Sequence, residues 1–124
     1  MHDKDRIITE KILDYCEQIK AAHSEFGDDK SLFDSDGRGA VYKNSVSMPI
    51  QQIGELAKRY SDDLIKDIPG VPWKQIKGMR DLFAHDYDEM DTDTIWETSH
   101  SNIEALQKEL QSYLEENNDM NSER

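Results

Sequence analysis

The sequence predicts an all-α protein, a bundle of four to five helices. Apolar residues recur at alternating steps of three and four positions through most of the chain, which is the spacing of one face of an α-helix. No segment alternates apolar and polar residues between hairpin turns, and the sequence contains no internal repeat. With 124 residues, of which 35% are hydrophobic, the chain has the length of one domain with one modest core.

The first half of the chain is predicted to form two long helices joined by a loop. The loop covers residues 27–39, because turn-forming Gly, Asp and Ser residues concentrate there, and it leaves room for one short turn at residues 31–33. A second helix follows over residues 40–60 and contains Pro49, which removes one amide donor. The first helix is predicted over residues 5–26 from the stripe Ile8, Ile12, Tyr15, Ile19, Ala22 and Phe26.

A short helix and a third long helix are expected next. Ser61 has the side-chain acceptor of a helix N-cap, and the Pro-Gly-Val-Pro run at residues 69–72 ends the short helix that follows it. Residues 73–87 then show helical periodicity, although Gly78 inside this segment lowers helix propensity by about 1 kcal/mol relative to Ala. That glycine would permit a close approach to another helix.

The last helix is expected to begin at a capping box. Thr94 and Glu97 have the Thr-x-x-Glu spacing of that motif, and an apolar face continues from it to Tyr113. We expect this helix to end near Leu114. The domain would then comprise residues 1–114, and the polar residues 115–124 would form a flexible tail.

Charge and cysteine content restrict the class of protein. Fifteen Lys and Arg against 27 Asp and Glu give a formal net charge of −12, the opposite of a protein that coats nucleic acid, so any contact with nucleic acid must be local. A single cysteine, Cys16, cannot form an intrachain disulfide, which favours a reducing, cytoplasmic location. No apolar run has the length of a membrane span, and we expect no membrane association.

Several common enzyme sites are excluded by their motifs. The chain lacks a phosphate-binding loop that ends in Lys-Ser or Lys-Thr, a His-Glu-x-x-His motif and a Gly-x-Ser-x-Gly motif. Its four histidines, His2, His23, His85 and His100, are scattered along the sequence, so no histidine metal site and no cofactor are expected. The acidic run over residues 86–93 fits either a carboxylate metal site or, more simply, a solvated turn.

One basic segment stands out in this acidic chain. Residues 71–80 contain Lys74, Lys77 and Arg80 and no acid, whereas residues 91–124 hold nine acids and two bases. We interpret Lys74 and Lys77 as candidate contacts to an RNA phosphate, and the Arg80 guanidinium as a bidentate phosphate ligand.

Two residues that follow Arg80 complete the candidate catalytic set. His85 can exchange protons near neutral pH, and Asp81 lies four residues before it, at the helical spacing for a carboxylate that orients an imidazole. On an ideal helix Arg80 and His85 point about 140° apart and lie about 7.5 Å apart along the axis, so a site would require a second subunit or a loosened helix. The same residues are also typical of a solvated helix face.

Other conspicuous residues favour structural roles. Trp73 and Trp96 lie beside apolar neighbours, as core residues do, and Cys16 lies in the apolar stripe of the first helix. Gly54 and Glu55 are interpreted as a close-packing glycine and an exposed acid.

Taken together, these motifs resemble those of a known family. The similarity covers nearly the whole chain, begins with Asp-x-x-Arg-Ile at residues 3–7 and is strongest over residues 50–96. The chain resembles the HepT-like ribonuclease toxins of the HEPN superfamily in Ile53-Gly54-Glu55, Val71-Pro72-Trp73-Lys74-Gln75-Ile76-Lys77-Gly78-Met79-Arg80, His85-Asp86-Tyr87 and Ile95-Trp96.

The resemblance implies a HEPN-type helical bundle that forms a two-fold homodimer and cleaves RNA without a metal. Arg80 would hold the scissile phosphate, and His85 would transfer protons around the ribose 2′-hydroxyl and leave a 2′,3′-cyclic phosphate. Asp81 occupies the polar position after the arginine, where many relatives have Asn. Whether Asp81 is catalytic or only structural stays open.

The resemblance also implies a regulatory partner. Tyr87 matches the tyrosine that a minimal nucleotidyltransferase (MNT) antitoxin adenylylates in this family, so the chain would be the toxin of a toxin-antitoxin pair. The alternative is a catalytically silent HEPN subunit that serves as a scaffold for a nucleotidyltransferase.

Overall fold

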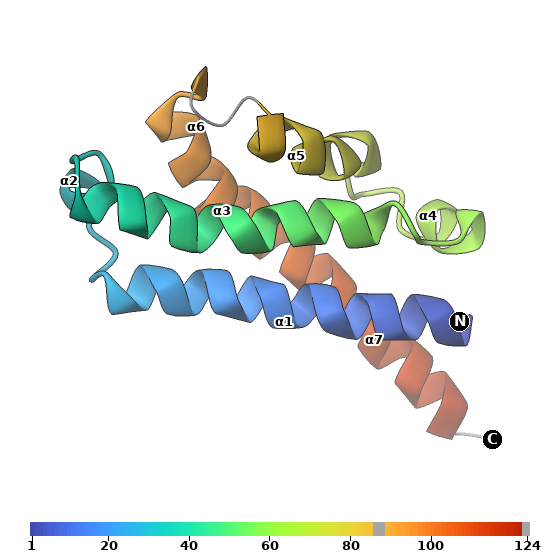
Figure 1. Cartoon of the computed structure of the whole chain (residues 1–124). Helices are drawn as coiled ribbons and strands as arrows, with labels where there is room; N and C mark the ends of the chain where they lie inside the picture. Colours follow the sequence, from blue (N-terminus) through green and yellow to red (C-terminus); the bar gives the residue numbers. More distant parts are fainter. Residues whose placement is uncertain (86–88, 123–124) are drawn as a thin grey trace.

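The computed structural model describes residues 1–85 and 89–122. All regular secondary structure in this part of the chain is helical (Figure 1). Tyr87 lies outside the described residues. The all-α prediction is confirmed. The elements are α1 (Asp3–Glu25), α2 (Lys30–Phe33), α3 (Arg38–Ala57), α4 (Asp62–Asp67), α5 (Trp73–His85), α6 (Thr92–Glu97), the π-helical turn η2 (Thr98–Asn102) and α7 (Ile103–Ser122).

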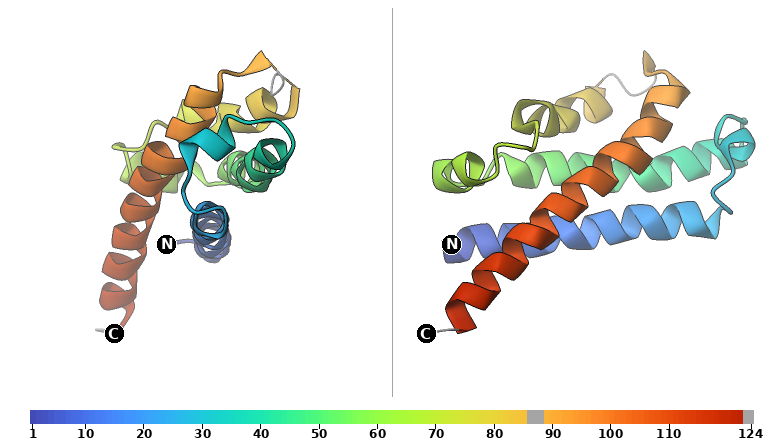
Figure 2. Two further views of the ribbon diagram at one scale, coloured as in Figure 1. Left: turned by 90° about the vertical axis from the view of Figure 1, so that its left-hand side faces the viewer. Right: turned by 180° about the vertical axis from the view of Figure 1, so that it is seen from behind.

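Helix α3 is the centre of the bundle. It lies beside α1 along most of its length, and α5 packs along its other side (Figure 1). Helices α6 and α7, joined by η2, form one long rod that crosses α1 and α3 obliquely, as the rear view in Figure 2 shows. No helix among the described residues is long and apolar enough to cross a membrane.

The core is formed by the predicted apolar stripes. Ile12, Ile19, Ile50 and Ile53 are fully buried between α1 and α3. Polar groups that enter the core have partners: the Thr9 and Tyr60 hydroxyls are 2.7 Å apart, and the Trp73 indole N–H donates to the Ile68 carbonyl at 2.9 Å. The remaining buried apolar residues are Ile8, Cys16, Phe33, Tyr42, Val46, Leu56, Ala57, Tyr60, Leu64, Ile68, Val71, Trp73, Ile76, Met79, Phe83, Ile95, Ile103, Leu106 and Leu110.

The start of α4 is as predicted, whereas the start of α6 is not. The Ser61 side chain accepts from the Leu64 amide at 3.2 Å and caps α4. Helix α6 begins two residues before the expected capping box, because the Asp91 carboxylate accepts from the Asp93 amide at 3.0 Å and takes the N-cap position. A carboxylate is as good a cap as the Thr94 hydroxyl, so the earlier residue starts the helix.

The last helix is longer than expected. We placed its end near Leu114, but α7 continues to Ser122. One contact from another helix holds this extension: the Arg6 guanidinium of α1 donates to the Asn118 side chain. Within α7, the side-chain amide of Asn117 donates to the Tyr113 carbonyl at 2.8 Å. The flexibility of residues 115–124 stays a prediction.

A polar and aromatic cluster closes the end of the bundle where α1 meets η2. His23 of α1 is only 6% exposed, and its ring lies against Tyr42 and Trp96, with ring centroids 5.3 Å away in each case. Burial, and then the neighbouring His100, lower the pKa of His23 to about 4, so the His23 ring is neutral at pH 7. Just beyond α1, Gly27 and Asp28 both adopt positive φ, 76° and 53°.

Candidate functional site on α5 and α3

The apolar face of α5 packs against the core and thereby places the basic residues of this helix toward the surface. Trp73, Ile76, Met79 and Phe83 are buried toward α3 and α7, at the helical spacing that the sequence indicated. The cations lie on the other sides of the same helix. Lys74 is exposed, and Lys77 and Arg80 are half-buried.

Gly54 of α3 determines where Arg80 lies. A Cβ atom at Gly54 would come within 2.7 Å of the Arg80 backbone nitrogen and 3.0 Å of the Ile76 carbonyl oxygen. The backbones of α3 and α5 therefore cross in direct contact at this point, which only glycine permits. The close-packing role expected for Gly54 is confirmed. Within the described chain, Gly78 does not have it, because nothing lies within 4 Å of a Cβ there.

Glu55 is the site residue that sequence reasoning missed. Its Oε2 atom lies 3.6 Å from Nε of Arg80, and the two side chains are 46% and 37% exposed. The sequence placed Glu55 next to the crossing glycine but gave no indication of which helix crosses there. Once α5 is known to pack on Gly54, the next residue of α3 is the natural neighbour of Arg80.

Asp81 and His85 are not joined as their spacing suggested. Oδ1 of Asp81 lies 3.7 Å from Nζ of Lys58, at the end of α3. The described side chains form no hydrogen bond or ion pair between Asp81 and His85, nor between Arg80 and His85. His85 is exposed and is the last residue of α5. The structure thus groups Arg80 and Asp81 with α3 and leaves His85 at the helix end.

A polar depression adjoins the ion pair. It has a volume of about 370 Å³, lies between α1 and α3, and includes Glu55 together with Lys11 and Arg59. Lys58 adds a further cation next to Asp81. The surface around Arg80 is therefore of mixed charge: it holds the cations Lys11, Lys58 and Arg59 and the acids Asp14, Glu55 and Asp81.

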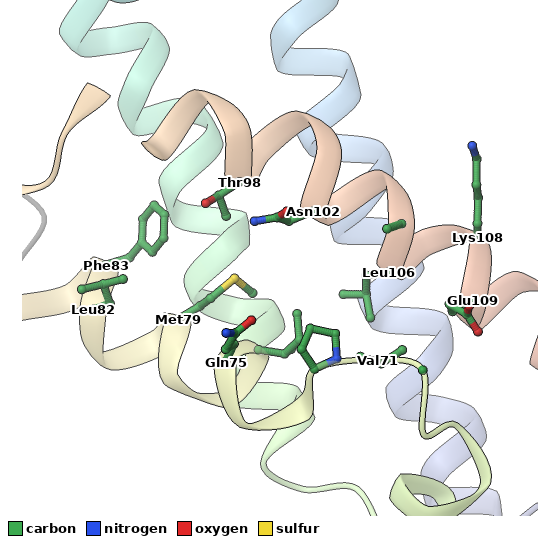
Figure 3. A pocket seen from close by; sticks show the side chains of 14 residues that line it. Val71, Gln75, Met79, Leu82, Phe83, Thr98, Asn102, Leu106, Lys108 and Glu109 are labelled. Carbon is green, nitrogen blue, oxygen red and sulfur yellow. The ribbon is translucent and has the colours of Figure 1, made fainter. Parts of the chain in front are cut away.

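A larger hollow lies on another part of the described surface. It is an apolar groove of about 500 Å³ between α5 and α7, with Met79, Phe83 and Leu106 among its walls and Leu82 at its rim (Figure 3). Neither Arg80 nor His85 lines it. Leu82 is 41% exposed.

Other candidate residues have structural roles. Cys16 is fully buried, and burial raises the pKa of its thiol to about 12, so it has no nucleophilic thiolate at neutral pH. Trp73 is buried, and Trp96 packs partly buried against the core. In the acidic run, Asp91 caps α6 and Asp93 pairs with Lys30 at 2.6 Å. Asp86 and Asp88 lie outside the described residues.

Comparisons with known proteins assign the family. The model of the "Ribonuclease HepT-like" family matches residues 12–113, which include Glu55, Arg80 and His85. The archaeal protein named "Putative RNase MJ1216" from Methanocaldococcus jannaschii is 30% identical over 110 residues, which are 85% of this chain and 83% of that protein.

Two further relatives match a shorter part of the chain. "Putative RNase TTE0752" from Caldanaerobacter subterraneus is 35% identical over 53% of this chain and 59% of its own length. "Probable ribonuclease HepT" from Thermococcus cleftensis is 31% identical over 50% of this chain and 56% of its own length. No solved structure gives a significant match. Because the family model spans most of the helical bundle, this chain belongs to the HepT-like ribonuclease family.

Proposed function

We propose that the chain is a metal-independent endoribonuclease that acts through Arg80 and His85. The observation that carries this proposal is the fixed position of Arg80, whose backbone rests on Gly54 and whose side chain meets Glu55. The printed names of all three relatives contain RNase or ribonuclease, which supports the substrate class.

Each residue has a defined task in the proposed reaction. His85 takes the proton of the ribose 2′-hydroxyl, the 2′-oxygen attacks the phosphorus, and the bond from phosphorus to the 5′-oxygen breaks. A second imidazolium returns a proton to the leaving 5′-oxygen, and the product is a 2′,3′-cyclic phosphate. The Arg80 guanidinium compensates the charge that develops on the phosphoryl oxygens. Lys74 and Lys77 hold neighbouring phosphates, and Asp81 orders the basic groups around Arg80 through Lys58.

The proposed active species is a two-fold homodimer. Five helical positions separate Arg80 from His85, so within one chain they point about 140° apart. A second copy of α5 would supply the complementary Arg and His to one cleft, which also provides the second imidazole that the proton transfers need. The exposed Leu82 beside the apolar groove is the side chain of α5 that such contact would cover.

Mutation of the two central residues tests the activity. In excess chelator and without partner proteins, the purified chain should cleave single-stranded RNA, and Arg80→Ala and His85→Ala should each reduce the rate by about 100-fold or more. The matched controls Arg38→Ala and His2→Ala change exposed residues of the same types and should retain the rate. Cleavage that needs added magnesium would refute the metal-independent mechanism.

A silent scaffold subunit is the alternative. The Glu55–Arg80 ion pair favours it, because a carboxylate already neutralises the arginine that RNA would need. Absence of RNA cleavage by the wild type would support that alternative over the enzyme. Full cleavage by both alanine variants would instead show that Arg80 and His85 are not the active site.

We also propose that the enzyme is the toxin of a toxin-antitoxin pair and is controlled at Tyr87 by an MNT-type nucleotidyltransferase. Tyr87 lies outside the described residues, and the resemblance of His85-Asp86-Tyr87 to the family motif is what supports it as the residue that accepts AMP. Co-expression with that partner should add AMP to the peptide that contains Tyr87, measured by mass spectrometry, while RNA cleavage falls. If Tyr87→Phe is still fully neutralised, control is by steric binding instead.

A further inference from the structure

Three potential metal ligands meet at a place unrelated to Arg80 and His85. They are His23 in the last turn of α1, Asp28 just beyond that helix, and His100 in η2, and one ligand atom of each lies within 4.8 Å of the others. The scattered histidines argued against a metal site, but the fold brings His23 and His100 together although 77 positions separate them in sequence.

Neighbouring groups hold both imidazoles in place. The two rings overlap, with centroids 3.7 Å apart and planes at 39°, and His100 also lies 4.2 Å from the Trp96 ring. Phe33 and Tyr42 flank the buried His23 on its other sides. These ring contacts keep both imidazoles close together before any ion binds.

The Trp96 carbonyl fixes the tautomer of His100. A carbonyl oxygen only accepts, and this one lies 3.0 Å from Nδ1 of His100, so the imidazole N–H is at Nδ1. The other nitrogen, Nε2, then carries a lone pair. It faces Oδ1 of Asp28 at 2.6 Å, so a cation has to link these two acceptors: either a proton, which makes His100 an imidazolium that donates to Asp28, or a metal ion.

The same carbonyl fixes His23 through Ser99. The Ser99 hydroxyl donates its hydrogen to the Trp96 carbonyl at 3.0 Å and must therefore accept from Nε2–H of His23 at 2.9 Å. Nδ1 of His23 consequently carries the lone pair, to which the Tyr42 hydroxyl donates. That nitrogen also faces Oδ1 of Asp28, at 3.8 Å.

We propose that His23, Asp28 and His100 form a binding site for a divalent transition metal of the Zn²⁺ class. Two neutral imidazoles and one carboxylate are a ligand set that Zn²⁺ takes readily, with bonds of about 2.0–2.2 Å. Each histidine donates its second N–H to a protein oxygen, the arrangement that orients metal-bound histidines. Both second partners, the Ser99 hydroxyl and the Trp96 carbonyl, are already in place.

The two distances from Asp28 require only a small adjustment, whereas the two rings must separate, because imidazoles on one tetrahedral ion have centroids about 5 Å apart and these are 3.7 Å apart. The His100 side chain is 29% exposed and can make this movement. Ligand atoms of a tetrahedral Zn²⁺ lie about 3.3 Å apart, given bonds of about 2.0 Å. Asp28 would move away from His100 by less than 1 Å and toward His23 by about half that, by the same tetrahedral geometry. Its side chain is 62% exposed and free of core packing, so it can make this movement. The Tyr42 hydroxyl would turn away from Nδ1 of His23.

The backbone at the site is of the kind that functional sites use. A π-helical turn, which is rare in general, carries Ser99 and His100, and a non-glycine residue with positive φ carries the third ligand, Asp28. The ligands open onto a depression of about 360 Å³ that Lys20 and Glu104 also line, so an ion and a bound water have access. A metal here would link α1 to η2 and thereby increase the free energy of unfolding.

Calorimetry tests the site directly. The tag-free full-length chain, treated with chelator and then dialysed, should bind one Zn²⁺ per chain, and Asp28→Asn and His100→Gln should each weaken binding by about tenfold or more. Asn tolerates positive φ as well as Asp does, so Asp28→Asn preserves the turn. The matched control His2→Gln removes an exposed histidine that pairs with Asp63 and should bind Zn²⁺ as the wild type does.

Two results would overturn the proposal. One is Zn²⁺ binding by the wild type that is no tighter than by Asp28→Asn. The other is a nuclear magnetic resonance spectrum in which Nε2 of His100 keeps its proton after Zn²⁺ is added, because a proton alone then bridges His100 and Asp28. Neither readout involves RNA, so failure here is separate from failure of the ribonuclease proposal.

Discussion

The Glu55–Arg80 pair is the feature of the candidate site with the most direct chemical effect. Both side chains are partly exposed and 3.6 Å apart, so the pair contributes little to stability, on the order of 1 kcal/mol or less. The pair instead affects how readily Arg80 can bind a phosphate. Any phosphate that Arg80 binds must replace a carboxylate that is already present.

Removal of this carboxylate should increase activity. We expect Glu55→Gln to lower KM for RNA by up to about fivefold, the equivalent of 1 kcal/mol, with the free energy of unfolding nearly unchanged. Steady-state cleavage of a short labelled RNA measures this. Glu10→Gln is the matched control, because it removes one exposed acid of α1. A fall in kcat at constant KM would instead mean that Glu55 holds Arg80 in its reactive orientation.

The sequence predicts the candidate residues better than it predicts their partners. Arg80, Asp81 and His85 follow from charge patterning and from the family motif, both of which are local along the chain. Glu55 and Lys58 belong to another helix, and their role depends on which helices cross and at which residue. That information lies in the Gly54 contact, which is a tertiary feature.

At the scale of elements, the crossing of α3 and α5 determines the geometry of the site. Two opposing effects decide the result of Gly54→Ala. Ala gains about 1 kcal/mol of helix propensity, whereas overpacking against backbone atoms that cannot move aside costs about 1–3 kcal/mol. Because the new Cβ would lie 2.7 Å from a backbone nitrogen, we expect the cost to prevail.

Gly54→Ala should therefore lower the midpoint of thermal unfolding by several degrees and reduce RNA cleavage more strongly, since α5 must shift with Arg80. Gly78→Ala is the control on the facing helix. It meets open space, so it should raise the midpoint. Circular dichroism melts of the wild type and the two variants measure the unfolding midpoints, and cleavage of a labelled RNA measures the activity. A Gly54→Ala protein as stable and as active as the wild type would show that the crossing is not tight.

Helix positions follow from the sequence, and some helix ends do not. The apolar periodicity predicted α1, α3 and α5, and the Ser61 N-cap predicted the start of α4, because both signals are local along the chain. The ends of α6 and α7 depend on competition. Asp91 precedes Thr94 as a cap, and the contact of Arg6 with Asn118 extends α7 past Leu114.

At the scale of the whole molecule, the net negative charge opposes the association of two chains. A net charge of −12 per chain repels both a second copy and RNA at long range, so association must rely on apolar contact. The exposed Leu82 and the groove beside it offer such contact on α5.

Leu82→Glu should convert the dimer to monomers and abolish RNA cleavage without unfolding the chain, because it adds a charge to an already exposed position. Sedimentation velocity at micromolar concentration measures the state of association. Ile7→Glu is the control, since Ile7 of α1 is 53% exposed and lies on another helix. A Leu82→Glu protein that stays dimeric would show that the dimer interface does not include Leu82. A monomeric variant that still cleaves RNA would show that the activity does not require a dimer.

The π-helical turn has a consequence for chain length. Ile95 and Ile103 are both buried, yet eight positions separate them, which on an unbroken α-helix is about 800°, or 80° beyond two turns. The π-helical turn η2 uses more residues per turn than an α-helix, so it compensates for the extra 80° and both side chains face the core. A chain one residue shorter between Glu97 and Ile103 would reach about 700° with an ordinary turn and keep both residues inward. Relatives can thus differ by one residue here and build the same bundle, but only the longer form sets Ser99 and His100 against His23.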